Sequence, residues 1–75
     1  MKASEIRQMD TREIHDQLEK NREELYKLRI SWTTGSLDDP TQMRRLRRDI
    51  ARLMTILHER ELAAEIVGEE ENNAQ

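Results

Sequence analysis

The chain has no cysteine, no phenylalanine, one proline, two glycines, one tryptophan and one tyrosine. Without cysteine there are no disulfides and no thiolate metal sites. Enzyme pockets are mostly apolar, concave and lined in part by aromatic side chains. A chain of 75 residues with 3% aromatic residues has little material to build one. The composition therefore excludes a large catalytic domain and allows one small domain.

Long apolar runs are also missing. No segment approaches the ~20 apolar residues that a membrane-spanning helix needs. The N-terminal ten residues lack the apolar stretch of a secretory signal. We therefore expect a cytoplasmic protein with no membrane partner, and no motif indicates a cofactor or a small-molecule substrate.

Charged residues, in contrast, make up 39% of the chain, and the net charge of −3 conceals an asymmetry. Residues 1–58 hold 12 Lys and Arg against 10 Asp and Glu, whereas residues 59–75 hold one Arg against six Glu. Between residues 41 and 58 five arginines accompany a single acid, Asp49. The overall acidity is therefore no argument against an anionic partner.

Apolar residues recur at helical spacing in a first stretch, which predicts a helix over residues 10–34. Asp10 and Glu13 form a capping-box pattern at its start, and Gly35 can adopt the left-handed conformation that ends a helix. Asn21 is the one polar residue on the apolar face, where it either fixes the helix register or leaves a partly exposed gap. The apolar residues of this face are Ile14, Leu18, Leu25, Leu28 and Trp32.

A second stretch predicts a helix over residues 40–67. Asp39 followed by Pro40 is typical of a helix cap with proline in the first helical position, and Gly68 is a plausible end. Residues 68–75 are polar and acidic, and we expect them to be disordered. The apolar face of this helix comprises Met43, Leu46, Ile50, Leu53 and Leu57.

Two apolar faces joined by a connector of about five residues predict an all-α fold. We expect one domain over residues 1–67, a long antiparallel two-helix hairpin with a short lead-in helix within 3–9. A hairpin buries only one stripe per helix, which barely offsets the entropy of the chain, so its native state is expected to involve a partner. The apolar residues off the two faces are candidates for that contact: Tyr26, Ile30, Met54 and Ile56.

Arginines form the most specific feature of the second helix. Arg44, Arg48 and Arg52 follow one another at steps of four on the side opposite the apolar face, Arg45 lies beside them and Arg47 at the flank. The steps correspond to about 6 Å along the axis, close to the repeat of a nucleic-acid backbone. The planar fork of Arg matches a phosphate group. The pattern indicates a phosphate-contacting face that is blind to sequence and sensitive to salt.

An alternative interpretation of this face is a solvated surface whose arginines pair with acids of the first helix. With two aromatic residues in the chain, stacking on single-stranded bases is not expected, and recognition of the backbone or shape of folded RNA is favoured. His15 and His58 are isolated in the sequence and predict no metal site. No Ser–His–Asp constellation and no glycine-rich phosphate loop indicates catalysis.

Much of the chain resembles the bacterial large-subunit ribosomal protein L twenty-nine family, and the block Arg-Arg-Asp-Ile-Ala-Arg at 47–52 is its most specific part. The matching segments are 2–7, 23–29, 35–40 and 43–59. The resemblance implies a non-enzymatic helical hairpin of the large ribosomal subunit, bound to its ribosomal RNA near the mouth of the nascent-peptide exit tunnel. It also implies ribosomal protein L twenty-three as a neighbour, with chaperones or targeting factors docking close by.

The resemblance also implies which residues contact RNA. The principal contacts would be Arg44, Arg45, Arg47, Arg48 and Arg52, and the secondary ones Lys2, Arg7 and Arg29. Two features depart from the family. Its members are usually basic overall, whereas residues 62–75 are acidic here and are expected to point toward solvent. Trp32 stands where a smaller residue is common, so the packing near the connector is expected to differ.

Two other functions remain open from the sequence. A free helical hairpin could act as a protein–protein adaptor that assembles into a coiled-coil oligomer, but such pairing does not need a cluster of arginines. Residues 6–17 also bear a faint resemblance to the first helix of small helical enzymes of the chorismate mutase type. Those enzymes need a further helix and a closed polar pocket, which this chain does not supply.

Overall fold

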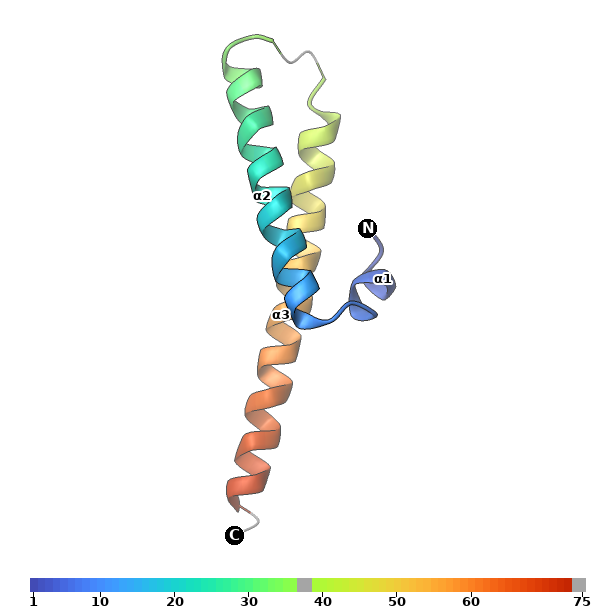
Figure 1. Ribbon diagram of the computed structural model, residues 1–75, viewed down its shortest axis with the longest axis vertical. Helices are drawn as coiled ribbons and strands as arrows, with labels where there is room; N and C mark the ends of the chain where they lie inside the picture. The colour runs from blue at the N-terminus through green and yellow to red at the C-terminus, as the bar shows by residue number, and fades with distance from the viewer. Residues whose placement is uncertain (37–38, 74–75) are drawn as a thin grey trace.

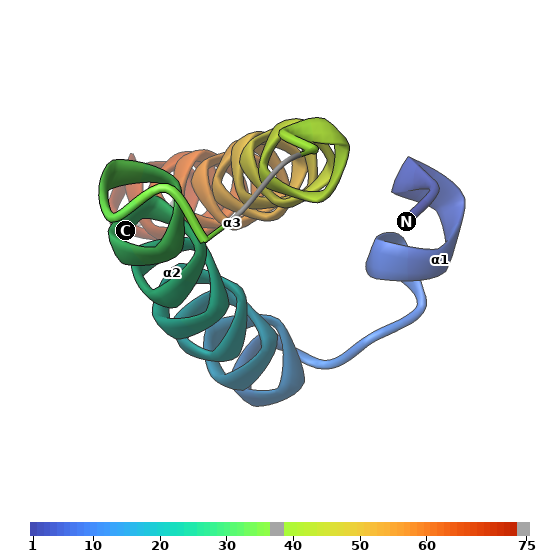
Figure 2. The same cartoon turned by 90° about the horizontal axis from the view of Figure 1, so that it is seen from above.

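Three helices make up the computed structural model, which describes residues 1–36 and 39–73, the side chains of 69–73 excepted (Figure 1). They are α1 (Ala3–Arg7), α2 (Thr11–Thr33) and α3 (Thr41–Asn73). Helices α2 and α3 run antiparallel, and the molecule measures 61 × 21 × 16 Å. Seen from above, α1 and α2 stand apart, and both pack on α3 (Figure 2). The predicted all-α hairpin with a short lead-in helix is confirmed.

Helix α2 begins and ends close to the predicted residues. The Asp10 carboxylate accepts a hydrogen bond of 2.8 Å from the backbone N–H of Glu13, which confirms it as the cap. At the other end Gly35 has a φ of 78°, a left-handed conformation that most side chains disfavour. This residue follows the end of α2, and its conformation favours glycine at this position.

Helix α3 begins at Thr41, one residue after the predicted start. The carboxylate of Asp39 accepts hydrogen bonds from the hydroxyl of Thr41 at 2.6 Å and from its backbone N–H at 3.0 Å. The carbonyl of Pro40 accepts the N–H of Arg44 at 3.1 Å. Proline has no N–H to lose at this point, so it fits the start of a helix. Asp39 therefore caps the start of the helix as predicted, but Pro40 stands just before the first helical residue and not in the first helical position.

The C-terminal end of α3 differs from the prediction, because the helix passes residue 67 and continues to Asn73. A glycine inside a helix costs only about 1 kcal/mol relative to alanine, and Gly68 has no left-handed φ. Glutamate is a good helix former, so the following acidic residues favour continuation. Of the tail predicted to be disordered, the backbone is helical as far as Asn73, and residues 74–75 lie outside the described residues.

The core lies where the three helices meet. Its buried side chains are Ile6, Ile14, Leu18, Leu53, Ile56 and Leu57, and Met9 and Ile50 pack against them. Leu25 and Leu46 are also buried, nearer the connector. The two predicted apolar faces thus supply most of the core, while α1 adds Ile6.

Two predictions about apolar residues are wrong. Ile56 was a candidate for contact with a partner, the alternative being an ordinary surface position, yet it is 3% exposed because α1 packs on that side of α3 and Ile6 joins the same cluster. Trp32 was expected on the buried face, yet it is 49% exposed. Trp32 lies in the last turn of α2, outside the core cluster, where it lines a groove with Pro40 and Met43. Tyr26 and Met54 are exposed, as is Ile30.

Arg60 holds the turn between α1 and α2 against α3. Its guanidinium donates hydrogen bonds to the carbonyls of Met9 at 2.6 Å and Arg7 at 3.2 Å, and to the hydroxyl of Thr11 at 3.1 Å. Because one guanidinium binds three acceptors between residues 7 and 11, it restricts the motion of this turn. Arg60 is thus a structural residue, which distinguishes it from the exposed arginines earlier in α3.

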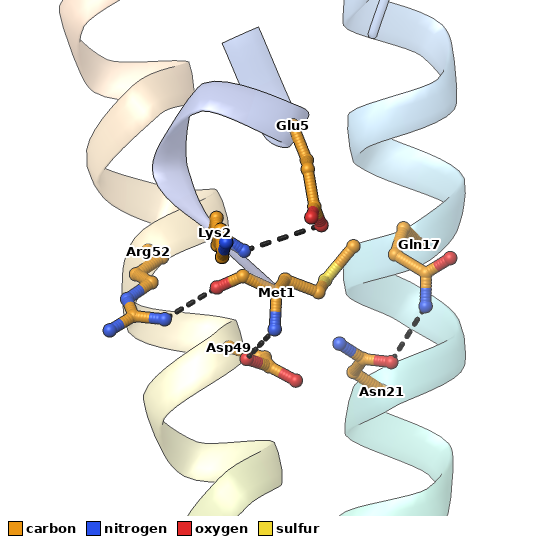
Figure 3. Close-up of polar contacts among 7 residues, drawn as sticks. All are labelled: Met1, Lys2, Glu5, Gln17, Asn21, Asp49 and Arg52. Carbon is orange, nitrogen blue, oxygen red and sulfur yellow. Dashed lines mark hydrogen bonds and ion pairs between the residues drawn. The ribbon is translucent and has the colours of Figure 1, made fainter. Parts of the chain in front are cut away.

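Asn21, the polar residue of the apolar face, is buried at 5% exposure. Its side-chain oxygen accepts a hydrogen bond of 2.8 Å from the amide of Gln17, one turn earlier in α2 (Figure 3). No buried side-chain nitrogen or oxygen lacks a partner in the described residues. The exposed-gap alternative for Asn21 is therefore wrong, and its partner lies within α2 rather than across the hairpin.

Candidate nucleic-acid interface

Five arginines of α3 are exposed along about two turns, and we call them the arginine face. They are Arg44, Arg45, Arg47, Arg48 and Arg52. Residues three or four apart lie on the same side of a helix, so the face forms one broad stripe. The secondary candidates Arg29, Lys2 and Arg7 are exposed as well. The structure places these cations in different surroundings.

The acids of α2 do not neutralise the arginine face. Among the described residues, the three ion pairs involve Met1 with Asp49, Arg7 with Glu59, and Arg22 with Glu19. None of them joins an arginine of the face to an acid. Asp49, the one acid within residues 41–58, is instead bound by the N-terminal ammonium of Met1 at 3.1 Å (Figure 3). The described ion pairs therefore leave the charge of the five guanidinium groups unneutralised.

Near α1, two of the predicted contacts also serve the fold. Arg52 donates a hydrogen bond to the carbonyl of Met1 (Figure 3), and Arg7 lies 3.8 Å from a carboxylate oxygen of Glu59. Arg48 and Arg52 line a shallow groove with Ala3 and Arg7. Lys2 lies in the same N-terminal segment, where its backbone N–H approaches Glu5 at 3.4 Å. The docking of α1 thus brings Arg7 and Lys2 to the arginine face.

At the end of the arginine face nearer the connector, α2 contributes side chains to a groove. Arg29 and Trp32 from α2 line one groove together with Arg44 and Arg47 from α3, and the groove has a volume of about 560 Å³. We call it the connector groove, and its remaining lining residues are Thr33, Pro40 and Met43. Sequence reasoning placed Arg29 among the secondary contacts and did not predict that it shares a site with Trp32.

Arg45 occupies a third setting, on a groove that Asp39 and Asp49 also line. The pKa of Asp39 is lowered, first by the hydrogen bond from the Thr41 hydroxyl, then by that from its backbone N–H. The nearby guanidinium groups of Arg44 and Arg45 lower it further. Asp39 is therefore ionised at neutral pH and makes this flank less positive than the connector groove.

The remaining candidates are the two histidines. His15 and His58 are brought together, since both line a groove between α2 and α3. However, the described residues contain no group of three or more potential ligands that could hold a metal ion. The described helices also include none whose length and hydropathy would allow it to span a membrane.

Comparisons with known proteins point to one family. The family model described as "Ribosomal L29 protein" matches residues 4–60. A "large ribosomal subunit protein uL29" of Caldicellulosiruptor bescii is 48% identical over 65 residues, 87% of this chain and 90% of the relative. Those of Carboxydothermus hydrogenoformans (46% over 67 residues, 89% and 97%) and Geobacillus stearothermophilus (48% over 64 residues, 85% and 97%) are similarly close. The chain therefore belongs to the ribosomal protein uL29 family.

Proposed function

We propose that this protein is a cytoplasmic structural constituent of the large ribosomal subunit that binds large-subunit ribosomal RNA through the arginine face of α3. Membership of the uL29 family supports the assignment to the subunit, because the relatives are named as proteins of that subunit. The role is one of binding and holding RNA, with no chemical step. The family resemblance further supports a position near the nascent-peptide exit tunnel, beside ribosomal protein L twenty-three and close to docking chaperones or targeting factors.

The observation that carries RNA binding is the lack of acidic partners for the arginine face. Five exposed guanidinium groups lie along one stripe, and no described ion pair neutralises them. Phosphate groups supply the missing charge in a geometry that the Arg fork matches, and each neutralised phosphate releases counterions. Such binding follows the backbone of a folded RNA and carries little sequence information.

The charge of the C-terminal part of the chain is consistent with RNA bound at the arginine face. The C-terminal part of the chain from residue 59 holds six glutamates and one arginine, so RNA phosphates repel it and it points away from them. A free coiled-coil adaptor has less support, because α2 and α3 bury their apolar faces against each other and against α1.

The test replaces three arginines of the face together, Arg44→Ala, Arg48→Ala and Arg52→Ala. Lysates of cells that carry the variant as their only copy are sedimented on sucrose gradients through a high-salt wash, and the protein is quantified in the large-subunit fraction. A charged hydrogen bond contributes about 1.5 kcal/mol or more. Loss of three such bonds therefore weakens binding by about a thousandfold or more, and we expect occupancy to collapse from near one copy per subunit.

The matched control removes the same charge from the outer face of α2. Arg12, Lys20 and Lys27 are exposed, and their replacement by alanine is expected to leave occupancy unchanged. Helical circular dichroism of both variants checks that the hairpin persists, since Arg52 also contacts Met1. Normal occupancy of the arginine-face variant refutes its role in RNA binding. Wild-type protein found only at the top of the gradient refutes the ribosomal assignment itself.

A further inference from the structure

The connector groove brings an exposed indole together with three guanidinium groups. Arg29 and Trp32 lie three residues apart and therefore on one side of α2, and Arg44 and Arg47 have the same spacing on α3. The antiparallel packing of the hairpin makes these two sides face one groove. Half of the Trp32 surface is exposed, although this is the largest side chain of the protein.

The hairpin does not use the exposed surface of the indole. Trp32 lies outside the core cluster, and the groove beside it is lined by the apolar side chains of Pro40 and Met43. The hydroxyl of Thr33 donates back to the carbonyl of Arg29 at 2.9 Å. Burying apolar and aromatic surface is favourable, so an indole left half-exposed in a groove is a platform for a flat apolar group.

The charges of the groove select an anionic ligand. Among the described residues, none that lines the groove is acidic, and no ion pair involves Arg29, Arg44 or Arg47. Asp39 lines the neighbouring groove, and its carboxylate already accepts two hydrogen bonds from Thr41. A ligand with a flat ring and negative charge on either side of it satisfies both the indole and the cations.

We propose that the connector groove binds an unpaired RNA nucleotide, whose base stacks on Trp32 while its flanking phosphates contact Arg29, Arg44 and Arg47. This rests on the proposed function, because Arg44 and Arg47 belong to the arginine face and RNA that follows the face reaches the groove. A paired base is enclosed in its helix, whereas an unpaired base exposes a ring face that aromatic side chains stack on. The scarcity of aromatic residues argued against stacking in the sequence, but the structure places the single tryptophan among three cations.

The test compares Trp32→Leu with Trp32→Phe in large subunits isolated from cells. Leucine keeps an apolar side chain but has no ring, whereas phenylalanine keeps a ring for stacking. Base-modifying reagents, read by reverse transcription of the ribosomal RNA, report which unpaired bases are protected. Stacking on one aromatic residue changes binding about tenfold or more. We therefore expect one or two bases to become roughly tenfold more reactive with leucine and to stay protected with phenylalanine.

The other aromatic residue provides a matched control. Tyr26 is 66% exposed on α2 and does not line the connector groove, so Tyr26→Leu is expected to change no base reactivity. A second measurement needs no substitution: ultraviolet irradiation of wild-type subunits is expected to crosslink the peptide that contains Trp32 to a nucleotide, which mass spectrometry identifies. This readout remains available even if Trp32→Leu fails to enter the subunit.

The outcomes separate this inference from the proposed function. Unchanged base reactivity with Trp32→Leu at normal occupancy overturns nucleotide binding and leaves RNA binding by the arginine face intact. Crosslinking of the Trp32 peptide to an acidic protein segment instead of RNA also overturns it. Absence of the wild-type protein from the subunit overturns the proposed function on which the inference rests.

Discussion

Ile6→Ala is expected to destabilise the hairpin although α1 has only five residues. Ile6 is the buried residue of α1, is fully inaccessible to solvent, and shares its cluster with side chains of both long helices. The substitution removes three buried carbon groups at about 0.8 kcal/mol each and leaves a cavity. The free energy of unfolding is therefore expected to fall by about 3 kcal/mol. A chain of this length has a total stability of about 4–11 kcal/mol, so this one side chain accounts for a large share.

Urea unfolding followed by helical circular dichroism measures the effect. With a slope of about 1 kcal/mol/M for so small a protein, the midpoint is expected to fall by about 3 M. The same truncation at Ile30, which is 47% exposed on α2, is the matched control and is expected to cost less than about 0.5 kcal/mol. Equal midpoints for Ile6→Ala and Ile30→Ala would refute the conclusion that α1 is part of the core.

Two further predictions concern the helix ends. The folded pKa of Asp39 is lowered, so its carboxylate stabilises the fold above the ordinary value of 3.8, and this contribution is lost as pH falls through the lowered pKa. Thermal unfolding of Asp39→Ala and the wild type should therefore differ at neutral pH and converge below pH 3.8, and a constant difference contradicts the assignment. Gly35→Ala forces alanine into a left-handed φ and should cost about 1 kcal/mol, whereas Gly68→Ala should stabilise α3 by up to about 1 kcal/mol. If both glycine variants shifted the urea midpoint in the same direction, the left-handed conformation of Gly35 and the helical conformation of Gly68 would be contradicted.

The sequence predicted the two long helices well because the signals involved are local. Apolar spacing, a capping aspartate and a left-handed glycine act within one or two turns, and Asp10, Gly35 and Asp39 all perform the expected role. The end of α3 was missed because a glycine is a weak stop signal by itself. Gly68 lacks the left-handed conformation that ends α2 at Gly35, and nothing local forces the helix to end there.

Features that depend on how the helices are placed could not be read from the sequence. Burial of Ile56 requires α1 to lie on that side of α3, and a five-residue helix has too few residues for a periodic signal. Two of the three hydrogen bonds of Arg60 go to backbone carbonyls, which leave no pattern in the sequence. The arginine face could be predicted because all its residues lie on one helix at regular spacing. The connector groove could not be predicted, because it forms only when Arg29 and Trp32 of α2 lie beside α3.

The contacts that fasten α1 join residues very far apart in the chain. The Met1 ammonium meets Asp49 across 48 positions, and the Met9 carbonyl meets Arg60 across 51. During synthesis the N-terminal residues therefore emerge long before their partners exist, and closing so long a loop costs entropy that no nearby contact offsets at that stage. We expect the hairpin of α2 and α3 to form first and α1 to dock last. Arg7 and Lys2 would then join the arginine face only once folding is complete.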